Sequence, residues 1–430
     1  MIKGIIIAGG KGKRLGKTTK KIPKSMIKIG DLPVLEHQIN LLKRYNIKEI
    51  IILTGHLSEV IEDYFKNGKN WKVNIICLRS DPVIGPADRV KLAEKQLTDD
   101  FIVFYGDIML DMNLKRLINF HKSKNSFCTL TLHPNDHPYD SDLVEIDNKQ
   151  KIIDFHSKPH QSNKYFKNLV NACVYVMSPK ILKYLKPKKD TELDFGKHIF
   201  PKIITQETLL GYHTPEYIKD IGTPERLKQV NKDYLSGKIK RFNSENKRKA
   251  IFLDRDGVIN YDPNDLSKID DFKLLPNVTK AIKLINSSDY LAIVVTNQPV
   301  IAKGLISFEG LNQIHKKMET LLGQEGVRLD GLYFCPHHPD KGYPGENPEY
   351  TIQCQCRKPQ TGLIKKAEKD FNIDLTNSWI IGDSKRDVIS GINAEIKTIL
   401  VKRNQQEFEK CPFKTKKVAD LYSAVKSILK

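Results

Sequence analysis

Apolar and polar positions follow two alternating patterns along the chain, and these patterns predict strands and helices in turn. In the first half, the predicted strands are short apolar runs at residues 49–53, 73–78, 101–105 and 127–132. Segments 34–45 and 58–65 carry apolar residues at helical spacing and are predicted helices. Strands that alternate with helices are typical of a doubly wound α/β sheet.

The second half repeats this alternation after a polar interval. Its predicted strands are residues 251–253, 291–295, 331–334, 378–381 and 398–401, and its predicted helices are 278–287, 308–322 and 362–371. Residues 237–248 are polar, charged and aperiodic, which is typical of a linker. We therefore expect two doubly wound α/β domains, at 1–236 and 249–430. The tail at 404–430 is predicted to lack strands and to end in a helix.

Length, charge and hydropathy narrow the class of protein. A chain of 430 residues suits two domains of about 200 residues each. No apolar run is long enough for a transmembrane helix, and the N-terminal run is too short for a secretory signal, so we expect a cytoplasmic protein. The net charge of +20 permits nucleic-acid binding. The lysines are spread along the chain, however, which favours phosphorylated small substrates and argues against nucleic-acid or membrane partners.

A glycine-rich loop follows the first apolar run. Gly9, Gly10 and Gly12 let the backbone approach phosphates closely, and Arg14 and Lys24 add cations at fixed distances. Asp107 follows the strand at 101–105, and Asp220 precedes a predicted helix. Such aspartates can hold magnesium while the cations neutralise a triphosphate. This set suits transfer of a nucleotidyl group to a phosphate oxygen, a reaction that needs no side-chain nucleophile.

Over residues 1–235 this set resembles the sugar-1-phosphate nucleotidylyltransferase family, which implies a Rossmann-like domain. The resemblance implies that Gly9, Gly10, Gly12, Arg14 and Lys24 bind the nucleoside triphosphate and that Asp107 and Asp220 hold Mg²⁺. It also implies that Glu145, Lys158 and Asn171 bind the sugar phosphate. Gly85 and Asp88 fall in the loop that lies near the base.

Three positions depart from the family pattern. Ser157 replaces the usual glutamate, Cys173 replaces a small residue, and Gly85-Pro86-Ala87-Asp88 replaces the usual Gly-Thr-Ala/Gly-Gly stretch. The last departure bears on the choice of nucleotide.

The second domain opens with paired carboxylates at the end of a strand. Asp254 can attack a phosphoryl group while Asp256, two residues later, moves a proton. Thr296 and Asn297 follow the next strand and can contact phosphate and substrate. Lys358 can neutralise the phosphoryl group, and Asp383 follows a further strand end. Asp254, Asp256 and Asp383 are therefore the expected Mg²⁺ site.

A cysteine cluster lies close to this set. The chain has seven cysteines, and three of them, Cys335, Cys354 and Cys356, group with His337. Three thiolates and one imidazole form a closed tetrahedral Zn²⁺ site, which is typical of a structural metal. Such an ion would hold Arg357 and Lys358 beside the phosphate.

Residues 249–403 resemble the haloacid dehalogenase superfamily of phosphatases, and the cluster points to one subclass. That subclass contains histidinol-phosphate phosphatase and D-glycero-D-manno-heptose-1,7-bisphosphate 7-phosphatase, and Arg357 beside Lys358 fits the heptose group better. The resemblance implies a Rossmannoid domain with a zinc loop, and it implies that Arg357 acts in catalysis and substrate binding. The segment after Gln298 departs from the heptose pattern.

The two resemblances together predict a bifunctional enzyme of nucleotide-activated heptose synthesis. The phosphatase would form heptose 1-phosphate, and the transferase would activate it with a nucleoside triphosphate, GTP being favoured. One enzymatic alternative remains: a mannose-1-phosphate guanylyltransferase joined to a phosphatase for histidinol phosphate or another sugar phosphate. A regulatory or scaffold fusion with one inactive domain is a non-enzyme alternative. A homo-oligomer is also possible.

Overall fold

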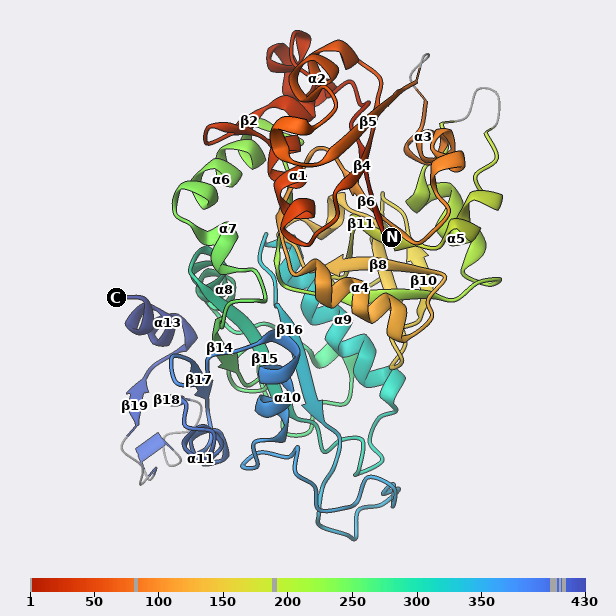
Figure 1. Ribbon diagram of the computed structural model, residues 1–430. Coiled ribbons are helices and arrows are strands. Elements are labelled where there is room, and N and C mark those ends of the chain that lie inside the picture. The colour runs from red at the N-terminus through yellow and green to blue at the C-terminus, as the bar shows by residue number, and fades with distance from the viewer. Residues whose placement is uncertain (1, 81–83, 188–191, 403–407, 410, 412–414) are drawn as a thin grey trace. The chain divides into compact units, whose positions relative to one another are not determined.

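The computed structural model describes residues 2–80, 84–187, 192–402, 408–409, 411 and 415–430 (Figure 1). The chain divides into two compact units. Unit 1 comprises 1–133, 141–158 and 169–243, and unit 2 comprises 134–140, 159–168 and 244–430. The last division falls within residues 237–248, where Lys238–Arg241 forms a short helix, α7. The domain limits predicted from the sequence stay a prediction.

Unit 1 is built on a sheet whose central path runs β10-β9-β11-β6-β1-β4-β5, with β8 paired to β11 and β12. Strands β6, β1, β4 and β5 are parallel, and β11 is antiparallel to β6. The strands of the sheet are β1 (Lys3–Ile7), β4 (Glu49–Thr54), β5 (Asn74–Arg79), β6 (Phe101–Tyr105), β8 (Cys128–His133), β9 (Leu143–Ile146), β10 (Ile152–His156), β11 (Val170–Met177) and β12 (Leu209–His213).

Two small ladders and the helices complete unit 1. The ladders pair β2 (Lys28–Ile29) with β3 (Leu32–Pro33) and β7 (Ile108–Asp111) with β13 (Tyr217–Asp220). The other helices are α1 (Val34–Arg44), α2 (Ser58–Phe65), α3 (Pro86–Leu92), α4 (Leu114–Ser123), α5 (Phe200–Ile203) and α6 (Pro224–Leu235).

Alternation of side chains along β1 explains why this sheet is covered on both faces. Successive side chains of a strand point to opposite faces. Ile5 and Ile7 join one apolar core, which includes residues of α3 and α5. Ile6 joins a second core with residues of α1, α2 and α4. A continuous isoleucine run is therefore what a strand buried on both faces requires.

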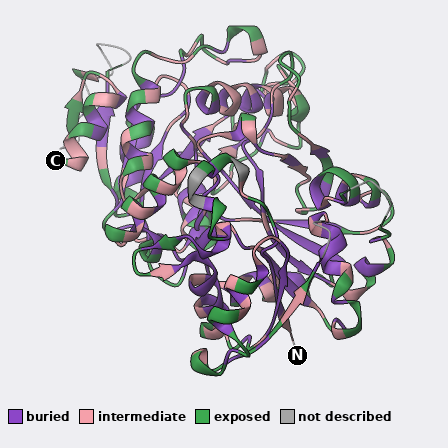
Figure 2. Ribbon diagram, turned by 90° about the horizontal axis from the view of Figure 1, so that it is seen from above, coloured by how far each residue is buried: buried purple, intermediate pink, exposed green. Residues whose placement is uncertain are grey.

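Unit 2 contains a six-stranded sheet in the order β16-β15-β14-β17-β18-β19, and every pairing is parallel. Its strands are β14 (Lys249–Leu253), β15 (Tyr290–Asn297), β16 (Gly331–Cys335), β17 (Trp379–Gly382), β18 (Lys397–Val401) and β19 (Lys416–Val418). Its helices are α8 (Val278–Ser287), α9 (Phe308–Gln324), α10 (Gly362–Phe371), α11 (Lys385–Asn393) and α13 (Leu421–Leu429). Figure 2 shows that the strands are largely buried while the helices carry exposed outer faces.

The predicted α/β class is confirmed, and one local prediction is wrong. The tail was expected to lack strands, yet β19 pairs in parallel with β18, and the closing helix α13 follows it. Lys416-Lys417-Val418 contains one apolar residue, so no hydrophobic pattern marks it as a strand. Its hydrogen bonds to an existing sheet edge supply the structure that its side chains do not indicate.

Unit 2 also contains two short segments from the N-terminal part of the sequence, residues 134–140 and 159–168. The main-chain N–H groups of Phe166 and Asn168 donate to Thr320 Oγ1 (2.8 Å) and Glu319 Oε2 (2.6 Å) on α9. Burial is the largest cause that raises the pKa of Glu319, and the bond from Asn168 opposes it. No helix in the described part of the chain has the length and apolar composition that crossing a membrane requires.

Candidate active sites

The glycine loop of unit 1 follows β1. Its glycines differ in why, and whether, the position requires a residue without a side chain. Gly12 has a φ of +61°, and a Cβ there would lie 2.9 Å from Thr19, so a side chain would be both strained and crowded. A Cβ on Gly9 would overlap the guanidinium of Arg89, whereas Gly10 is exposed with open space beside it. Gly10 is therefore the position of this loop with room for a ligand.

The two predicted magnesium ligands of unit 1 are brought together by the ladder of β7 and β13. Asp220 pairs with Ile108 in this ladder, and the N–H of Ile221 donates to the carbonyl of Asp107 (3.0 Å). Both carboxylates already bind cations: Lys24 forms an ion pair with Asp107, and Arg226 lies 3.0 Å from Asp220 Oδ2. Carboxylate oxygens are the donors that Mg²⁺ prefers, so this pair fits the ion. An ion there would compete with Lys24 for Asp107.

Arg14 belongs to the same end of the sheet. A Cβ placed on Gly222 would lie 3.1 Å from Arg14 Nη2, so this guanidinium lies close to the turn that follows Asp220. The structure therefore gathers Arg14, Lys24, Asp107 and Asp220 near the loop that begins at the end of β1.

The predicted sugar-binding residues lie in or near strands β9, β10 and β11. Asn171 lies in β11, where the register shifts before Tyr175 and Cys173 adopts a φ of +54°. The N–H of Lys158 donates to Asp142 Oδ1 (3.2 Å), while the N–H of Asn171 donates to the carbonyl of Asp142 (2.9 Å). Lys158 and Asn171 thus share Asp142. The Oε1 of Glu145 lies 3.0 Å from His156 Nε2.

The loop at Gly85–Asp88, whose sequence differs from the family pattern, stabilises the local structure. Asp88 is 4% exposed, and its Oδ2 accepts hydrogen bonds from the N–H groups of Gly85 (3.2 Å) and Leu193 (2.8 Å). A Cβ on Gly85 would overlap the main chain of Leu193. The Asp88 carboxylate therefore caps α3 and ties it to residue 193, and contact with a base stays a prediction.

In unit 2, the predicted residues other than the cysteine cluster line one cavity of about 280 Å³. Asp254, Asp256, Thr296, Asn297 and Asp383 lie where β14, β15 and β17 end, as parallel pairing requires, whereas Arg357 and Lys358 precede α10. This lining is formed by Asp254, Asp256, Thr296, Asn297, Arg357, Lys358 and Asp383.

Lys358 is the centre of charge in this cavity. It is 2% exposed, and its Nζ lies 2.8 Å from Asp254 Oδ2 and 2.6 Å from Asp387 Oδ1. The ammonium also donates to the carbonyl of Val295 (2.8 Å). Burial raises the pKa of Asp254 to about 6, although Lys358 opposes this shift. A buried cation between two carboxylates is a suitable place for a phosphoryl group to be neutralised.

Asp256 is held as a carboxylate. Burial opposes its ionisation, but Arg255 and the hydrogen bonds from Asn260 and Gln298 outweigh burial and lower its pKa. Arg255 Nη2 lies 2.8 Å from Asp256 Oδ1, and Gln298 Nε2 donates to Oδ2 (2.7 Å). The carboxylate form is the one that accepts a proton.

Three carboxylates of this cavity lie close enough to share a metal ion, and two of them belong to the predicted Mg²⁺ set. Among the described residues, oxygens of Asp254, Asp383 and Asp387 lie within 4.8 Å of one another. The Asp256 carboxylate is instead engaged by Arg255, Asn260 and Gln298. The group of three oxygens fits Mg²⁺ chemically. Asp387 lies one turn beyond Asp383, and the predicted set of Asp254, Asp256 and Asp383 stays a prediction.

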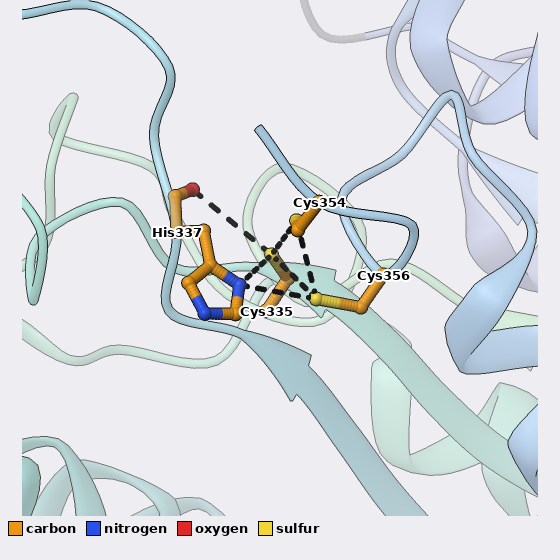
Figure 3. Close-up of side chains that lie close together, drawn as sticks. All are labelled: Cys335, His337, Cys354 and Cys356. Carbon is orange, nitrogen blue, oxygen red and sulfur yellow. Dashed lines mark hydrogen bonds between the residues drawn. The ribbon is translucent and has the colours of Figure 1, made fainter. Parts of the chain in front are cut away.

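The cysteine cluster comes together at the end of β16 (Figure 3). The Cys356 sulfur lies 3.2 Å from the Cys335 sulfur and 3.3 Å from the Cys354 sulfur. His337 Nδ1 lies 3.2 Å from the same Cys356 sulfur. All three cysteines are free thiols. Three sulfurs and one ring nitrogen facing a common point are the donor set of a closed zinc site. Arg357 Nη1 donates to the carbonyl of His337 (3.1 Å), which links the cluster to the cavity.

Comparisons with known proteins separate the two halves of the chain. A family model described as nucleotidyl transferase matches residues 3–237, which is more than half of the chain. A HAD-hydrolase-like model matches residues 355–424. The D-glycero-beta-D-manno-heptose-1,7-bisphosphate 7-phosphatase of Pasteurella multocida is 37% identical over 187 residues, covering 42% of this chain and 98% of its own. The chain belongs to the nucleotidyl transferase family and, through its second half, to the family of this phosphatase.

Two further similarities agree with this assignment. The phosphatase of the same name from Haemophilus ducreyi is 41% identical over 157 residues, 36% of this chain and 84% of its own. A solved structure from Bacillus anthracis, designated a glucose-1-phosphate thymidylyltransferase in complex with a sucrose, is 26% identical with a TM-score of 0.50. It covers 54% of this chain and 94% of that chain. The family resemblances inferred from the sequence are therefore confirmed.

Several residues near the transferase and phosphatase sites were not found from the sequence. A Cβ on Gly196 would lie 2.7 Å from Asp142 Oδ2, 3.4 Å from Asp194 Oδ1 and 3.5 Å from Asn171 Nδ2, so these polar groups surround one point. In the phosphatase part, Lys303, His338 and Arg386 also line the cavity. Asp142 and Asp194 belong to no spaced motif, and His338 stands beside the predicted zinc ligand His337 without a predicted role of its own.

Zinc is expected to copurify at about one ion per chain. Cys354→Ser removes one of four donors and should lower the zinc content measured by mass spectrometry of the purified protein. Cys77→Ser, outside the cluster, is the matched control and should retain the metal. Undiminished zinc in Cys354→Ser would contradict the site.

Lys358→Ala is expected to abolish phosphatase activity and to lower the free energy of unfolding by about 3–5 kcal/mol, because it leaves two buried carboxylates without their cation. Chemical denaturation and phosphate release measure the two effects. Lys365→Ala is the control, because Lys365 pairs with Glu368 on the surface of α10 and should cost less than about 1 kcal/mol. Equal stabilities would contradict the role of Lys358 as a buried counter-charge.

Proposed function

We propose that this chain is a bifunctional enzyme that catalyses two consecutive steps in the synthesis of a nucleotide-activated heptose. The C-terminal part hydrolyses the 7-phosphate of D-glycero-D-manno-heptose 1,7-bisphosphate. The N-terminal part transfers a nucleotidyl group, with GTP as the favoured donor, to heptose 1-phosphate and releases pyrophosphate. One observation carries the proposal: a chain of the nucleotidyl transferase family is also similar to phosphatases that are named for a heptose bisphosphate.

The phosphatase reaction follows from the cavity of unit 2. An oxygen of Asp254 attacks phosphorus, the bond to the sugar oxygen breaks, and the protonated form of Asp256, which the second step regenerates, supplies the proton that this oxygen needs. Water then attacks the phosphorus of the aspartyl phosphate, its proton passes to Asp256, and the bond between phosphorus and the Asp254 oxygen breaks to release phosphate. The lowered pKa of Asp256 favours this second role, while Lys358 balances the charge of the phosphoryl oxygens. Magnesium held by Asp254, Asp383 and Asp387 would add charge neutralisation.

The transferase reaction relies on position and charge. An oxygen of the sugar phosphate attacks the α-phosphorus, and the bond to the pyrophosphate oxygen breaks. Arg14 and Lys24 neutralise the triphosphate, while Lys158 and Asn171 hold the sugar phosphate. Magnesium held by Asp107 and Asp220 would draw charge from the leaving pyrophosphate. In the proposed sequence of reactions, phosphate leaves carbon 7 before carbon 1 is activated. The phosphatase part therefore acts first, although it comes second along the chain.

Asp254→Asn is expected to abolish phosphate release from the bisphosphate and to leave pyrophosphate release from heptose 1-phosphate intact. Asp107→Ala is expected to do the reverse, since this carboxylate lies in the other site. Separate assays of phosphate and pyrophosphate on the two full-length variants test this. Loss of both activities in Asp254→Asn would contradict independent sites.

A substrate screen tests the substrates themselves. Wild type is offered heptose 1,7-bisphosphate, heptose 1-phosphate or mannose 1-phosphate with each of four nucleoside triphosphates, and sugar nucleotides are detected by mass. Histidinol phosphate is included for phosphate release. We expect product from both heptose phosphates and most with GTP. Product from mannose 1-phosphate alone, or phosphate release from histidinol phosphate alone, would overturn the heptose assignment.

A further inference from the structure

The most unusual charged group of unit 1 is a buried arginine behind the glycine loop. Arg89 lies in α3 and is 2% exposed. Its Nη1 donates to the carbonyl of Thr54 (2.7 Å) and to Ser80 Oγ, and its Nη2 donates to the carbonyl of Gly9 (3.2 Å). One guanidinium therefore binds the last residue of β4 and the loops that follow β1 and β5.

The glycines around this group show how closely it is enclosed. A Cβ on Gly55 would lie 2.6 Å from Arg89 Nη1, 2.9 Å from Nη2 and 3.0 Å from the carbonyl of Gly9, and a Cβ on Gly9 would overlap the guanidinium. Both positions need glycine because the arginine occupies the space. The conformation of the predicted phosphate loop and the position of Arg89 are thus fixed together.

Arg89 forms no ion pair with a carboxylate among the described residues. Its hydrogen bonds go to neutral oxygens. Burial is the largest cause that lowers its pKa, with Glu192 and Asp88 opposing the shift, but a guanidinium remains protonated at neutral pH. A buried charge without a counter-ion is costly unless an anion approaches it. The carboxyl end of a parallel sheet is where anionic ligands of such folds bind.

We propose that Arg89 is a positioning residue for the nucleoside triphosphate: it holds the glycine loop against the end of β4 and the loop after β5 and supplies positive charge from behind it. The inference rests on the proposed nucleotidyl transfer and deepens it. Arg89 touches neither the phosphates nor the reacting atoms in this scheme. It acts through Gly9, and because the group is buried, its field is screened less than that of a surface cation.

The test separates charge from hydrogen bonding. Arg89→Lys keeps the charge with fewer directed donors, Arg89→Gln keeps a donor without the charge, and Arg89→Ala removes both. Lys95→Gln removes one exposed charge beyond the same helix and is the matched control. For each full-length protein, we would measure equilibrium binding of magnesium nucleoside triphosphate, the two KM values and kcat of transfer, and phosphate release as a control for folding.

We expect Arg89→Gln and Arg89→Ala to weaken nucleotide binding about tenfold or more, since charge-assisted hydrogen bonds are lost. Arg89→Lys should fall between these variants and wild type. The KM for the sugar phosphate and the rate of phosphate release should stay within about twofold, and millimolar guanidinium should partly restore nucleotide binding to Arg89→Ala. Lys95→Gln should behave as wild type.

Gly55→Ala gives an independent arm. The new methyl group should displace the guanidinium and weaken nucleotide binding in wild type, but it should have a smaller effect when Arg89→Ala has already cleared the space. If Arg89→Ala unfolds the transferase, the intermediate behaviour of Arg89→Lys and the effect of Gly55→Ala decide the question.

The outcomes distinguish this inference from the proposed function. Wild type that binds nucleotide but transfers nothing would overturn the transfer reaction and leave the role of Arg89 in binding. Variants that bind nucleotide as wild type does, or whose two KM values rise together without rescue, would overturn the positioning role. Wild type that binds no nucleoside triphosphate would overturn both.

Discussion

Parallel pairing at the centre of each sheet is the constraint on which both sites depend. Strand β1 is hydrogen-bonded to β4 and β6, and β14 to β15 and β17, with every strand running in the same direction. The carboxyl ends of neighbouring strands therefore meet at one edge, where loops from distant parts of the sequence become adjacent. Asp254, Thr296 and Asp383 are far apart along the chain and line one cavity for this reason.

The sequence was informative wherever a side chain stands directly after an apolar strand. The strands that carry Asp107, Asp254 and Asp383 could be predicted from their apolar runs, and their positions at strand ends follow from topology. Contacts that depend on side-chain direction could not be predicted. Asp256 turns to Arg255 and Gln298 while Asp387 turns to Lys358, and both carboxylates have the same chemistry in the sequence. Arg89 was missed because a single arginine in an amphipathic helix resembles a solvated residue.

The two units treat buried charge in contrasting ways. Lys358 is enclosed between two carboxylates, so its charge is balanced within the protein. Arg89 is enclosed by neutral oxygens, so its charge is balanced only at a distance. A phosphoryl group that enters the phosphatase cavity meets Lys358, a cation that already binds the proposed nucleophile Asp254. A triphosphate that enters the transferase site meets the glycine loop, with the positive charge of Arg89 behind it. The phosphatase arrangement suits covalent chemistry on phosphorus, and the transferase arrangement suits binding of a ligand that the protein does not attack.

The segments at 134–140 and 159–168 bear on how far the two activities are modular. These segments precede residue 243 in the sequence, yet they belong to the compact unit of the phosphatase. A fragment that starts at residue 244 would leave the carboxylate of Glu319 without the N–H of Asn168 and would uncover Gly323, which packs against Pro138. A single cut in the gene therefore does not yield the complete phosphatase unit. An evolutionary exchange of either half would also have had to re-cover the surface of α9.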